Sequence, residues 1–296
     1  MSPEELENSF PDAFITDKQM IELGDGVKVA IYRFLPNELV SKNGKDTIVF
    51  IPGFIGYLEN WAIIINKLVS LGFPVVVFET REKKSSSATD RSARFSIEGF
   101  LQDFKEVLET INLTRPFSIV GVSLGSGVAI EHAAYNKKQE LTPRKMVLLD
   151  AIYESTQVNW LITVAKLPCQ LFKLLINLAI KLAPILLWRI KKREEFTYKK
   201  ILSNLKEADP YKMRWALLQS KNATIINDLP KVKNPTLVLG IPNDLEHPYE
   251  QSLTVAQEVQ NGFFVNMEND EKLHSEQTAI IIADFLMEKS SFKNIS

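Results

Sequence analysis

Residues 117–125 read FSIVGVSLG, and this stretch decides the fold. The mostly apolar run from Phe117 to Val122 predicts a buried strand, and residues 124–135 have a helical pattern that begins directly behind it. The turn between them, residues 121–125, has the form G-x-S-x-G. Between a strand and a helix, this pattern holds a serine hydroxyl above the sheet, and the small glycines let neighbouring elements approach closely. We therefore predict a nucleophilic serine at position 123.

Short apolar runs alternate with helical patterns on both sides of this turn. Continuous apolar strands separated by helices indicate the α/β class, with a mostly parallel sheet that has helices on both faces. The chain begins differently, because residues 18–36 contain two strand patterns around Gly24-Asp25-Gly26, which predict an antiparallel hairpin. Further strands are expected at 47–52, 75–79, 145–150, 235–240 and 263–267, and further helices at 60–70, 96–111, 253–259 and 275–287, with Ser96 as an N-cap.

Residues 153–222 interrupt the alternation of strands and helices. Between Glu154 and Glu194 this segment has no acidic residue but seven Lys and Arg, and residues 170–182 predict an apolar helix with a narrow polar stripe. Prolines and regularly spaced lysines keep every uncharged run shorter than the ~18 residues of a membrane span. We predict a catalytic domain of residues 14–152 and 223–290, with a helical cap of residues 153–222 inserted after the sixth strand.

The composition is that of an ordinary globular chain, with 296 residues, 45% hydrophobic and 24% charged side chains. Thirty-five Lys and Arg against 36 Asp and Glu give a net charge of -1, so no chain-wide field attracts nucleic acid. The single cysteine, Cys169, excludes an internal disulfide, and the acidic residues before Lys18 do not have the pattern of a secretory signal. We therefore expect a cytoplasmic protein.

A serine nucleophile needs a base that a carboxylate holds in place, and the chain has three histidines. His132 falls in the helix behind Ser123, where a packing or surface role is the simplest interpretation. Asp244 follows one predicted strand and His274 follows the next, so the two can meet at the carboxyl edge of the sheet. We predict that His274 is the base and Asp244 its partner. His247 is the fallback base, but its separation of three residues from Asp244 favours a place in the pocket wall.

These features resemble the α/β-hydrolase fold superfamily from about Lys18 to Met287. The motifs occur in the family's order: IPGF at residues 51–54, where the family has its oxyanion loop, then ETR at residues 79–81, and then the serine turn. The resemblance implies Ser123 as nucleophile, His274 as base and then acid, and Asp244 as the carboxylate that orients it. It implies an oxyanion hole made by the backbone N–H groups of Phe54 and Leu124.

The sequence also departs from the family pattern. Pro52 replaces a histidine of the oxyanion loop, Val122 replaces the common histidine before the nucleophile, and Ser126 replaces a frequent glycine. Asp150 ends the sixth strand, a position that some relatives use for the acid, so Asp150 stays an alternative to Asp244.

The resulting prediction is a serine hydrolase, a carboxylesterase or lipase-like enzyme that needs no metal and no cofactor. It would cleave a hydrophobic or lipid-like ester through an acyl-enzyme on Ser123. We expect Val122, His247, Trp160 and Phe172 to bind the substrate, beneath a cap whose large apolar side chains form the roof of the pocket. Those roof residues are Trp160, Phe172, Leu174, Leu175 and Trp188.

Two other functions stay open from the sequence. One is a non-hydrolytic or carbon–carbon bond-cleaving enzyme, or an acyltransferase, on the same scaffold. The other is a catalytically disabled binding protein, which the residues at 52 and 122 motivate. The cationic, apolar cap also suggests peripheral contact with an anionic membrane, although its helices could equally bury their apolar faces on one another. The sequence does not predict the oligomeric state.

Overall fold

The computed structural model describes residues 14–36, 45–89, 94–111, 113, 116–155, 159–242, 244, 246–289 and 292–296. In these ranges eight strands form one sheet in the order β1-β2-β4-β3-β5-β6-β7-β8. β2 pairs antiparallel with β1 and with β4, and the other pairs are parallel, so the predicted hairpin and the mostly parallel sheet are both confirmed. The strands are β1 Phe14–Glu22, β2 Lys28–Leu35, β3 Thr47–Ile51, β4 Val75–Phe78, β5 Phe117–Val122, β6 Met146–Leu149, β7 Thr236–Gly240 and β8 Gly262–Asn266.

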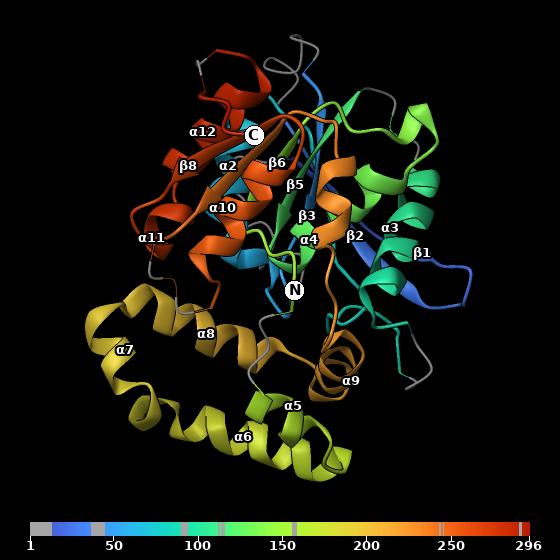
Figure 1. Cartoon of the computed structure of the whole chain (residues 1–296). Coiled ribbons are helices and arrows are strands. Elements are labelled where there is room, and N and C mark those ends of the chain that lie inside the picture. Colours follow the sequence, from blue (N-terminus) through green and yellow to red (C-terminus); the bar gives the residue numbers. More distant parts are fainter. Residues whose placement is uncertain are drawn as a thin grey trace.

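Helices cover both faces of the sheet (Figure 1), as the alternating pattern predicts. Two of them, α2 and α12, pack together on one face, and α3, α4 and α10 pack on the other. The helices that flank the sheet are α2 Ala62–Ser70, α3 Ile97–Ile111, α4 Leu124–Tyr135, α10 Tyr249–Glu258, α11 Asp270–Leu273 and α12 Glu276–Leu286, and the short 3-10 helices are η2 Leu58–Trp61, η3 Gln139–Leu141 and η4 Ile226–Lys231.

The central strand β3 explains why such strands have continuous apolar sequences. Val49 and Ile51 belong to the core beneath α3 and α4, while Ile48 and Phe50 belong to the core beneath α2 and α12. All four side chains are completely buried. A strand that is covered on both faces must be apolar at every position, since successive side chains point to opposite sides.

The segment between β6 and β7 is helical and lies against the carboxyl edge of the sheet (Figure 1). Its own small core contains Ala165, Phe172, Ile176, Met213 and Leu217. None of the helices within the described ranges combines the length and apolar character needed to cross a membrane. The helices of this segment are α5 Asn159–Ala165, α6 Cys169–Leu186, α7 Trp188–Arg193, α8 Glu195–Glu207 and α9 Pro210–Ser220.

The two ends of this helical segment lie side by side. Ser155 N–H donates to the carbonyl of Ala223 at 2.9 Å, and Ile225 N–H donates to the carbonyl of Tyr153 at 2.7 Å. An isolated antiparallel bridge joins Glu154 to Thr224 between these two bonds. The chain therefore leaves the sheet and returns to it through one short paired stem.

Candidate active site

Ser123 occupies a strained turn between β5 and α4. Its φ of 48° and ψ of -111° lie in a region that side-chain-bearing residues rarely adopt. Two glycines permit this turn: a Cβ on Gly125 would lie 2.1 Å from the carbonyl oxygen of Ile51, and a Cβ on Gly121 would lie 2.6 Å from that of Gly125. Because Ser123 N–H donates to Leu149 of β6 at 3.0 Å, the turn is also tied to the neighbouring strand.

His247 is the imidazole that contacts this serine. Its Nε2 lies 2.9 Å from Ser123 Oγ, and its Nδ1 lies 3.4 Å from Asp244 Oδ2. Asp244 follows β7 and closes a tight turn, because its Oδ1 accepts from the backbone N–H groups of Glu246 at 2.5 Å and His247 at 3.1 Å. This turn brings the ring back over the serine, so three side chains from two loops form a connected Ser–His–Asp chain.

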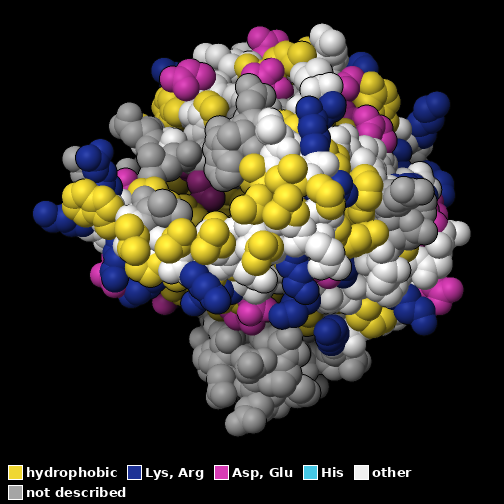
Figure 2. All heavy atoms as spheres, turned by 90° about the horizontal axis from the view of Figure 1, so that it is seen from below, with side chains coloured by type: hydrophobic (Ala, Val, Ile, Leu, Met, Phe, Trp, Pro, Cys, Tyr) yellow, Lys and Arg dark blue, Asp and Glu magenta, His cyan; other side chains and the backbone are white. Residues whose placement is uncertain are grey.

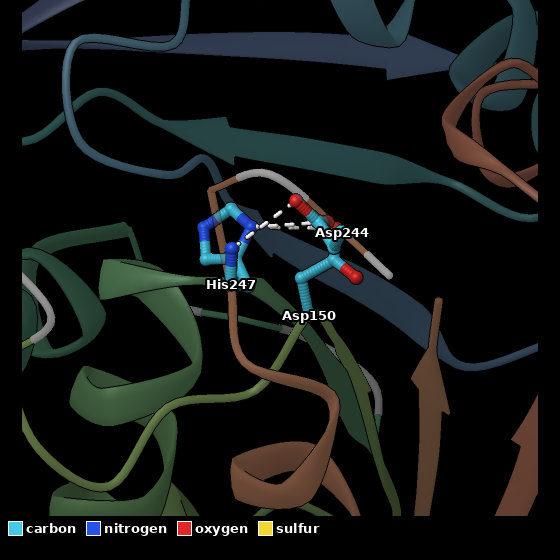
Figure 3. Close-up of side chains that lie close together, drawn as sticks. All are labelled: Asp150, Asp244 and His247. Carbon is cyan, nitrogen blue, oxygen red and sulfur yellow. Dashed lines mark hydrogen bonds and ion pairs between the residues drawn. The ribbon is translucent and has the colours of Figure 1, made fainter. Parts of the chain in front are cut away.

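A second carboxylate faces the same imidazole (Figure 3). Asp150 directly follows β6, is 3% exposed, and places its Oδ2 3.9 Å from His247 Nδ1. Its φ of 47° is also in the left-handed region. Asp244 is the nearer of the two carboxylates and forms the hydrogen bond with His247. Asp150 is too far away for a hydrogen bond and acts on the imidazole through its charge.

The two carboxylates change the protonation of the site. Burial disfavours a charged His247, but the hydrogen bond to Asp244 and the charge of Asp150 outweigh it and raise the pKa of His247 to about 9. Burial raises the pKa of Asp150 to about 7, although the charge of His247 opposes the rise. Burial acts in the same direction on Asp244, yet the hydrogen bond and charge of His247 hold its pKa below the usual range. The imidazole therefore takes up a proton more readily than a free histidine.

The structure corrects the predicted position of His274. Its Nδ1 lies 2.9 Å from the backbone oxygen of Asp270 and 3.1 Å from the Asp270 carboxylate, and its ring stacks on Trp61 with 4.3 Å between ring centroids. It has no hydrogen bond to Ser123 among the described residues. His247 is only three residues from Asp244, and from the sequence alone this separation argues against His247 as the base. The turn that Asp244 closes requires this short separation.

The partner of His274 belongs to an ionic network that reaches the cap. Lys200 of α8 lies 2.8 Å from both Asp270 Oδ2 and Glu246 Oε2, and Thr197 donates to Asp270 at 3.0 Å. Burial raises the pKa of Asp270, but the hydrogen bond from His274 and the charge of Lys200 together lower it well below its usual value. Since Glu246 precedes His247, the network connects a cap helix to the loop of the imidazole. No pattern in the sequence identified Lys200.

A cavity of about 820 Å³ is lined both by residues at the carboxyl edge of the sheet and by residues of the helical segment. The cavity is lined by the polar residues Ser123, Asp150, Asp244, His247 and His274, and by Val122. The rest of the wall is mostly apolar and comes from the loops, the cap helices, η2 and α3. This part of the wall includes Ile152, Leu161, Ile176, Leu205, Met213, Leu217 and Ile225.

The roof of the cavity differs from the one predicted. Phe172 is completely buried in the core of the cap and does not line the cavity, whereas Ile176, one turn later, does. Leu174 and Trp188 face solvent, with exposed fractions of 61% and 53%, and Leu175 does not line the cavity either. The side chain of Trp160 lies outside the described part of the structure. Sequence shows that α6 is apolar but does not show which of its faces points inward.

The predicted oxyanion loop lies close to the serine. A Cβ on Gly53 would lie 3.3 Å from Ser123 Cβ, and both Phe54 and Leu124 line the cavity. Gly56 N–H donates to the carbonyls of Gly53 at 3.2 Å and Phe54 at 2.6 Å, which folds the loop back on itself.

Lys83 forms a hydrogen bond with the loop at residues 52–56. Its Nζ donates to the carbonyl of Gly53 at 2.5 Å and pairs with Glu82 at 2.7 Å, and the side chain is buried. This lysine comes from the loop after β4, and its hydrogen bond fixes the carbonyl that follows Pro52. Sequence reasoning missed Lys83, because nothing in its spacing connects it to the loop at 52–56.

Asp150, Asp244 and His247 are also the residues that could hold a metal ion. Their ligand atoms lie within 4.8 Å of one another, the one such group in the part of the chain that the structure describes. Both ring nitrogens of His247 already face protein partners, Asp244 on one side and Ser123 on the other. A metal would have to break one of these contacts, so the arrangement favours proton transfer.

Three solved structures have the same arrangement of elements. A hydrolase from Pseudomonas aeruginosa PA01 superposes with a TM-score of 0.70 at 15% sequence identity, covering 92% of this chain and 98% of that chain. An esterase from Exiguobacterium antarcticum gives a TM-score of 0.71 at 15% identity, covering 92% and 100%. The enol-lactonase from Burkholderia xenovorans LB400 gives 0.68 at 16% identity, covering 91% and 100%. At these identities the likeness shows a shared fold.

The sequence itself gives one family assignment. No curated protein matches it. Residues 46–231 match the family model of the alpha/beta hydrolase fold, and this range includes the serine turn and the whole helical segment. The chain therefore belongs to the alpha/beta hydrolase fold family.

Proposed function

We propose that this protein is a serine hydrolase that cleaves carboxylic esters with a hydrophobic acyl group. The observation that carries the proposal is the 2.9 Å contact between Ser123 Oγ and His247 Nε2 at a strained turn of the sheet. A hydroxyl held against an imidazole, which a carboxylate orients in turn, is the arrangement that makes serine nucleophilic. The esterase and the enol-lactonase of the same fold agree with a hydrolytic reaction.

The reaction follows from this geometry. Neutral His247 takes the Ser123 proton on Nε2 while Oγ forms a bond to the ester carbonyl carbon. The tetrahedral intermediate collapses, the C–O bond to the alcohol breaks, and His247 returns its proton to the leaving alkoxide. Water then gives a proton to His247 and attacks the acyl carbon. The second collapse releases the carboxylic acid and restores the Ser123 hydroxyl.

The oxyanion of both intermediates needs hydrogen-bond donors. Phe54 and Leu124 both line the cavity with Ser123, and we assign their backbone N–H groups to this role because neither donates to another backbone group outside the helices and strands of the described residues. Losing one such donor costs on the order of a hundredfold in rate. Lys83 acts as a positioning residue for this loop, because its hydrogen bond to Gly53 fixes the peptide unit that precedes Phe54.

The cavity wall favours an apolar acyl chain. Ile176, Leu205 and Met213 are among the side chains that surround the space beyond Ser123. Each methylene that leaves water contributes about 0.8 kcal/mol, so a long chain gains affinity in proportion to its length. Affinity for p-nitrophenyl esters is therefore expected to rise from acetate towards octanoate.

Fluorophosphonate labelling tests the assignment of both residues. Wild type should be labelled and should hydrolyse p-nitrophenyl butyrate, while Ser123→Ala and His247→Ala should lose both activities. Two matched controls should keep them: His274→Ala, which removes the other cavity imidazole, and Ser118→Ala in β5, the strand before the serine turn, where the Ser118 Oγ has no hydrogen-bond partner. Circular dichroism establishes that each variant is folded.

The other outcomes discriminate between the alternatives. Labelling that survives His247→Ala but not His274→Ala would contradict the assignment of the base. Labelling of Ser123 without turnover of any ester would indicate an acyltransferase or a carbon–carbon bond-cleaving enzyme. A folded wild type that neither reacts with the fluorophosphonate nor hydrolyses p-nitrophenyl butyrate would indicate a binding protein.

A further inference from the structure

The outer face of α6 and α7 has an exposed apolar stripe. Its side chains follow one another at intervals of three or four residues, which places them on one side of the helix. Figure 2 shows this apolar band across the face of the molecule seen from below, with basic side chains along its edges. Ile185 is the most exposed, at 69%. The stripe consists of Leu171, Leu174, Leu178, Leu182, Ile185 and Trp188.

The stripe is not needed for packing within the chain. The opposite face of α6 already packs against the rest of the cap through Phe172 and Ile176, and Ala183 is buried as well. On that same inner face, Ile176 and Ala179 line the cavity. One helix therefore has an inner face that forms the cavity wall and an outer face that presents leucines and a tryptophan to solvent. Exposed apolar patches of this kind mark interaction surfaces.

The charges on α6 and α7 are all positive. Between residues 155 and 193 the sequence has seven Lys and Arg and no acidic residue, and Lys173, Lys181, Arg189, Lys191 and Lys192 are exposed. The rest of the chain has 28 basic and 36 acidic residues, a net charge of -8. An anionic surface is thus attracted by this face and repelled by the remainder, which orients the molecule.

We propose that the stripe docks α6 and α7 on an anionic lipid surface. α6 has 18 residues, about 27 Å of helix, and would lie along the membrane plane with its apolar side chains among the acyl chains. The lysines and arginines on both flanks would reach the anionic headgroups. A second copy of this chain is a poor occupant, because two such faces would bring their positive charges together.

Docking in this orientation deepens the proposed function. The cavity that holds Ser123 lies on the inner side of the helix that would rest on the membrane. A lipid ester leaving the bilayer would then have a short path to the site. This second step rests on the proposed hydrolase activity, whereas the docking surface does not depend on it.

Vesicle cosedimentation of the full chain tests the docking surface. Wild type is expected to bind vesicles of phosphatidylcholine with about 30% phosphatidylserine, and to bind pure phosphatidylcholine at least tenfold more weakly. Ile185→Ser with Trp188→Ser removes part of the stripe, and Lys191→Gln with Lys192→Gln removes two flanking charges. Each pair should weaken binding on the order of tenfold. The matched control, Ile63→Ser with Ile280→Ser, replaces exposed apolar residues on α2 and α12 and should bind like wild type.

Trp188 provides a direct readout of insertion. Its emission should shift to shorter wavelength when anionic vesicles are added, and Trp188→Phe should abolish that shift while the other tryptophans remain. Equal binding by the stripe variants and the control pair would overturn the proposal. So would a concentration-dependent dimer in sedimentation that Ile185→Ser with Trp188→Ser dissociates, because it would assign the stripe to a second copy.

Hydrolysis of a soluble short-chain ester keeps the two proposals apart. The stripe variants are expected to retain wild-type turnover of p-nitrophenyl acetate. If Ser123→Ala is as active as wild type, the hydrolase proposal fails, but the vesicle results stand. If vesicle binding is absent and Ser123 dependence is intact, the docking proposal fails alone.

Discussion

Lys200 Nζ lies 2.8 Å from Asp270 Oδ2, so a cap helix is joined by a buried ion pair to the residue that holds His274. Both side chains are about nine-tenths buried. The same ammonium group pairs with Glu246, one residue before His247. The position of the cap and the geometry of the imidazole loop are therefore coupled through one cation.

Replacing Lys200 with Met should destabilise the protein. The change leaves Asp270 buried without its cation, and removing one partner of a buried pair costs about 3–5 kcal/mol. Thermal unfolding should show a clear fall in Tm relative to Lys199→Met. Lys199 is the control because its pair with Glu195 is exposed, and exposed pairs contribute little. Equal Tm values for the two variants would show that the buried pair does not stabilise the cap.

The rate of ester hydrolysis should rise with pH towards about 9. His247 accepts a proton from Ser123 only when it is neutral, and its pKa is raised to about 9, so the active fraction increases as pH rises through that value. Folding stability has the opposite sign. The raised pKa contributes stability that is present below the ordinary histidine value and lost as pH rises through 9.

The pH profile of kcat/KM checks this expectation. Asp150→Asn removes one of the charges that raise the His247 pKa, so the midpoint of its profile should move to lower pH. Asn tolerates the positive φ at this position, which makes it a conservative replacement. A wild-type midpoint near the ordinary histidine value would contradict the electrostatic account of the site.

Asp244→Asn should reduce kcat far more than Asp150→Asn does. Asp244 forms the hydrogen bond that fixes the tautomer of His247, and loss of the equivalent carboxylate in a serine triad costs about 10⁴-fold. Asp150 lies 3.9 Å away and acts through its charge. Steady-state kinetics of both variants on one ester decides which carboxylate orients the base. The reverse order of effects would assign that role to Asp150.

Gly125→Ala should prevent the serine turn from forming. The new Cβ would lie 2.1 Å from the backbone oxygen of Ile51, and neither group is a flexible side-chain end that could move aside. The variant should therefore be strongly destabilised in urea unfolding. Gly127→Ala in the same helix is the control, since its nearest neighbour would be the Ile97 side chain at 3.4 Å. A stable, active Gly125→Ala protein would show that the turn has more room than its geometry indicates.

The sequence predicted the elements with strong local signals. The bounds of β5 and α4 coincide with the expected ranges, because a mostly apolar run and a glycine turn mark where the strand ends and the helix begins. Ser96 caps α3 as expected, with its Oγ 3.3 Å from Gly99 N. The helix expected from residue 253 begins at Tyr249 instead, since its first turn is polar and does not reveal the apolar period.

The parts of the site that the sequence missed depend on tertiary contacts. Strand order alone cannot show the turn that Asp244 closes, which is why the sequence did not predict the contact between His247 and Ser123. The roles of Lys83 and Lys200 come from contacts with residues far away in the chain. The sequence also does not show which face of α6 points towards the cavity, because both faces of that helix are apolar.

The paired stem at Tyr153 and Ile225 has a consequence for how this scaffold can vary. Because the chain departs and returns through adjacent backbone, the module between these points could be exchanged for a shorter or longer one without displacing any strand. The residues around Ser123 would stay in place, but a replacement module would have to supply a cation for Asp270 and Glu246 where Lys200 now lies. Modules that keep this one contact could therefore change the shape of the binding space while the serine turn is retained.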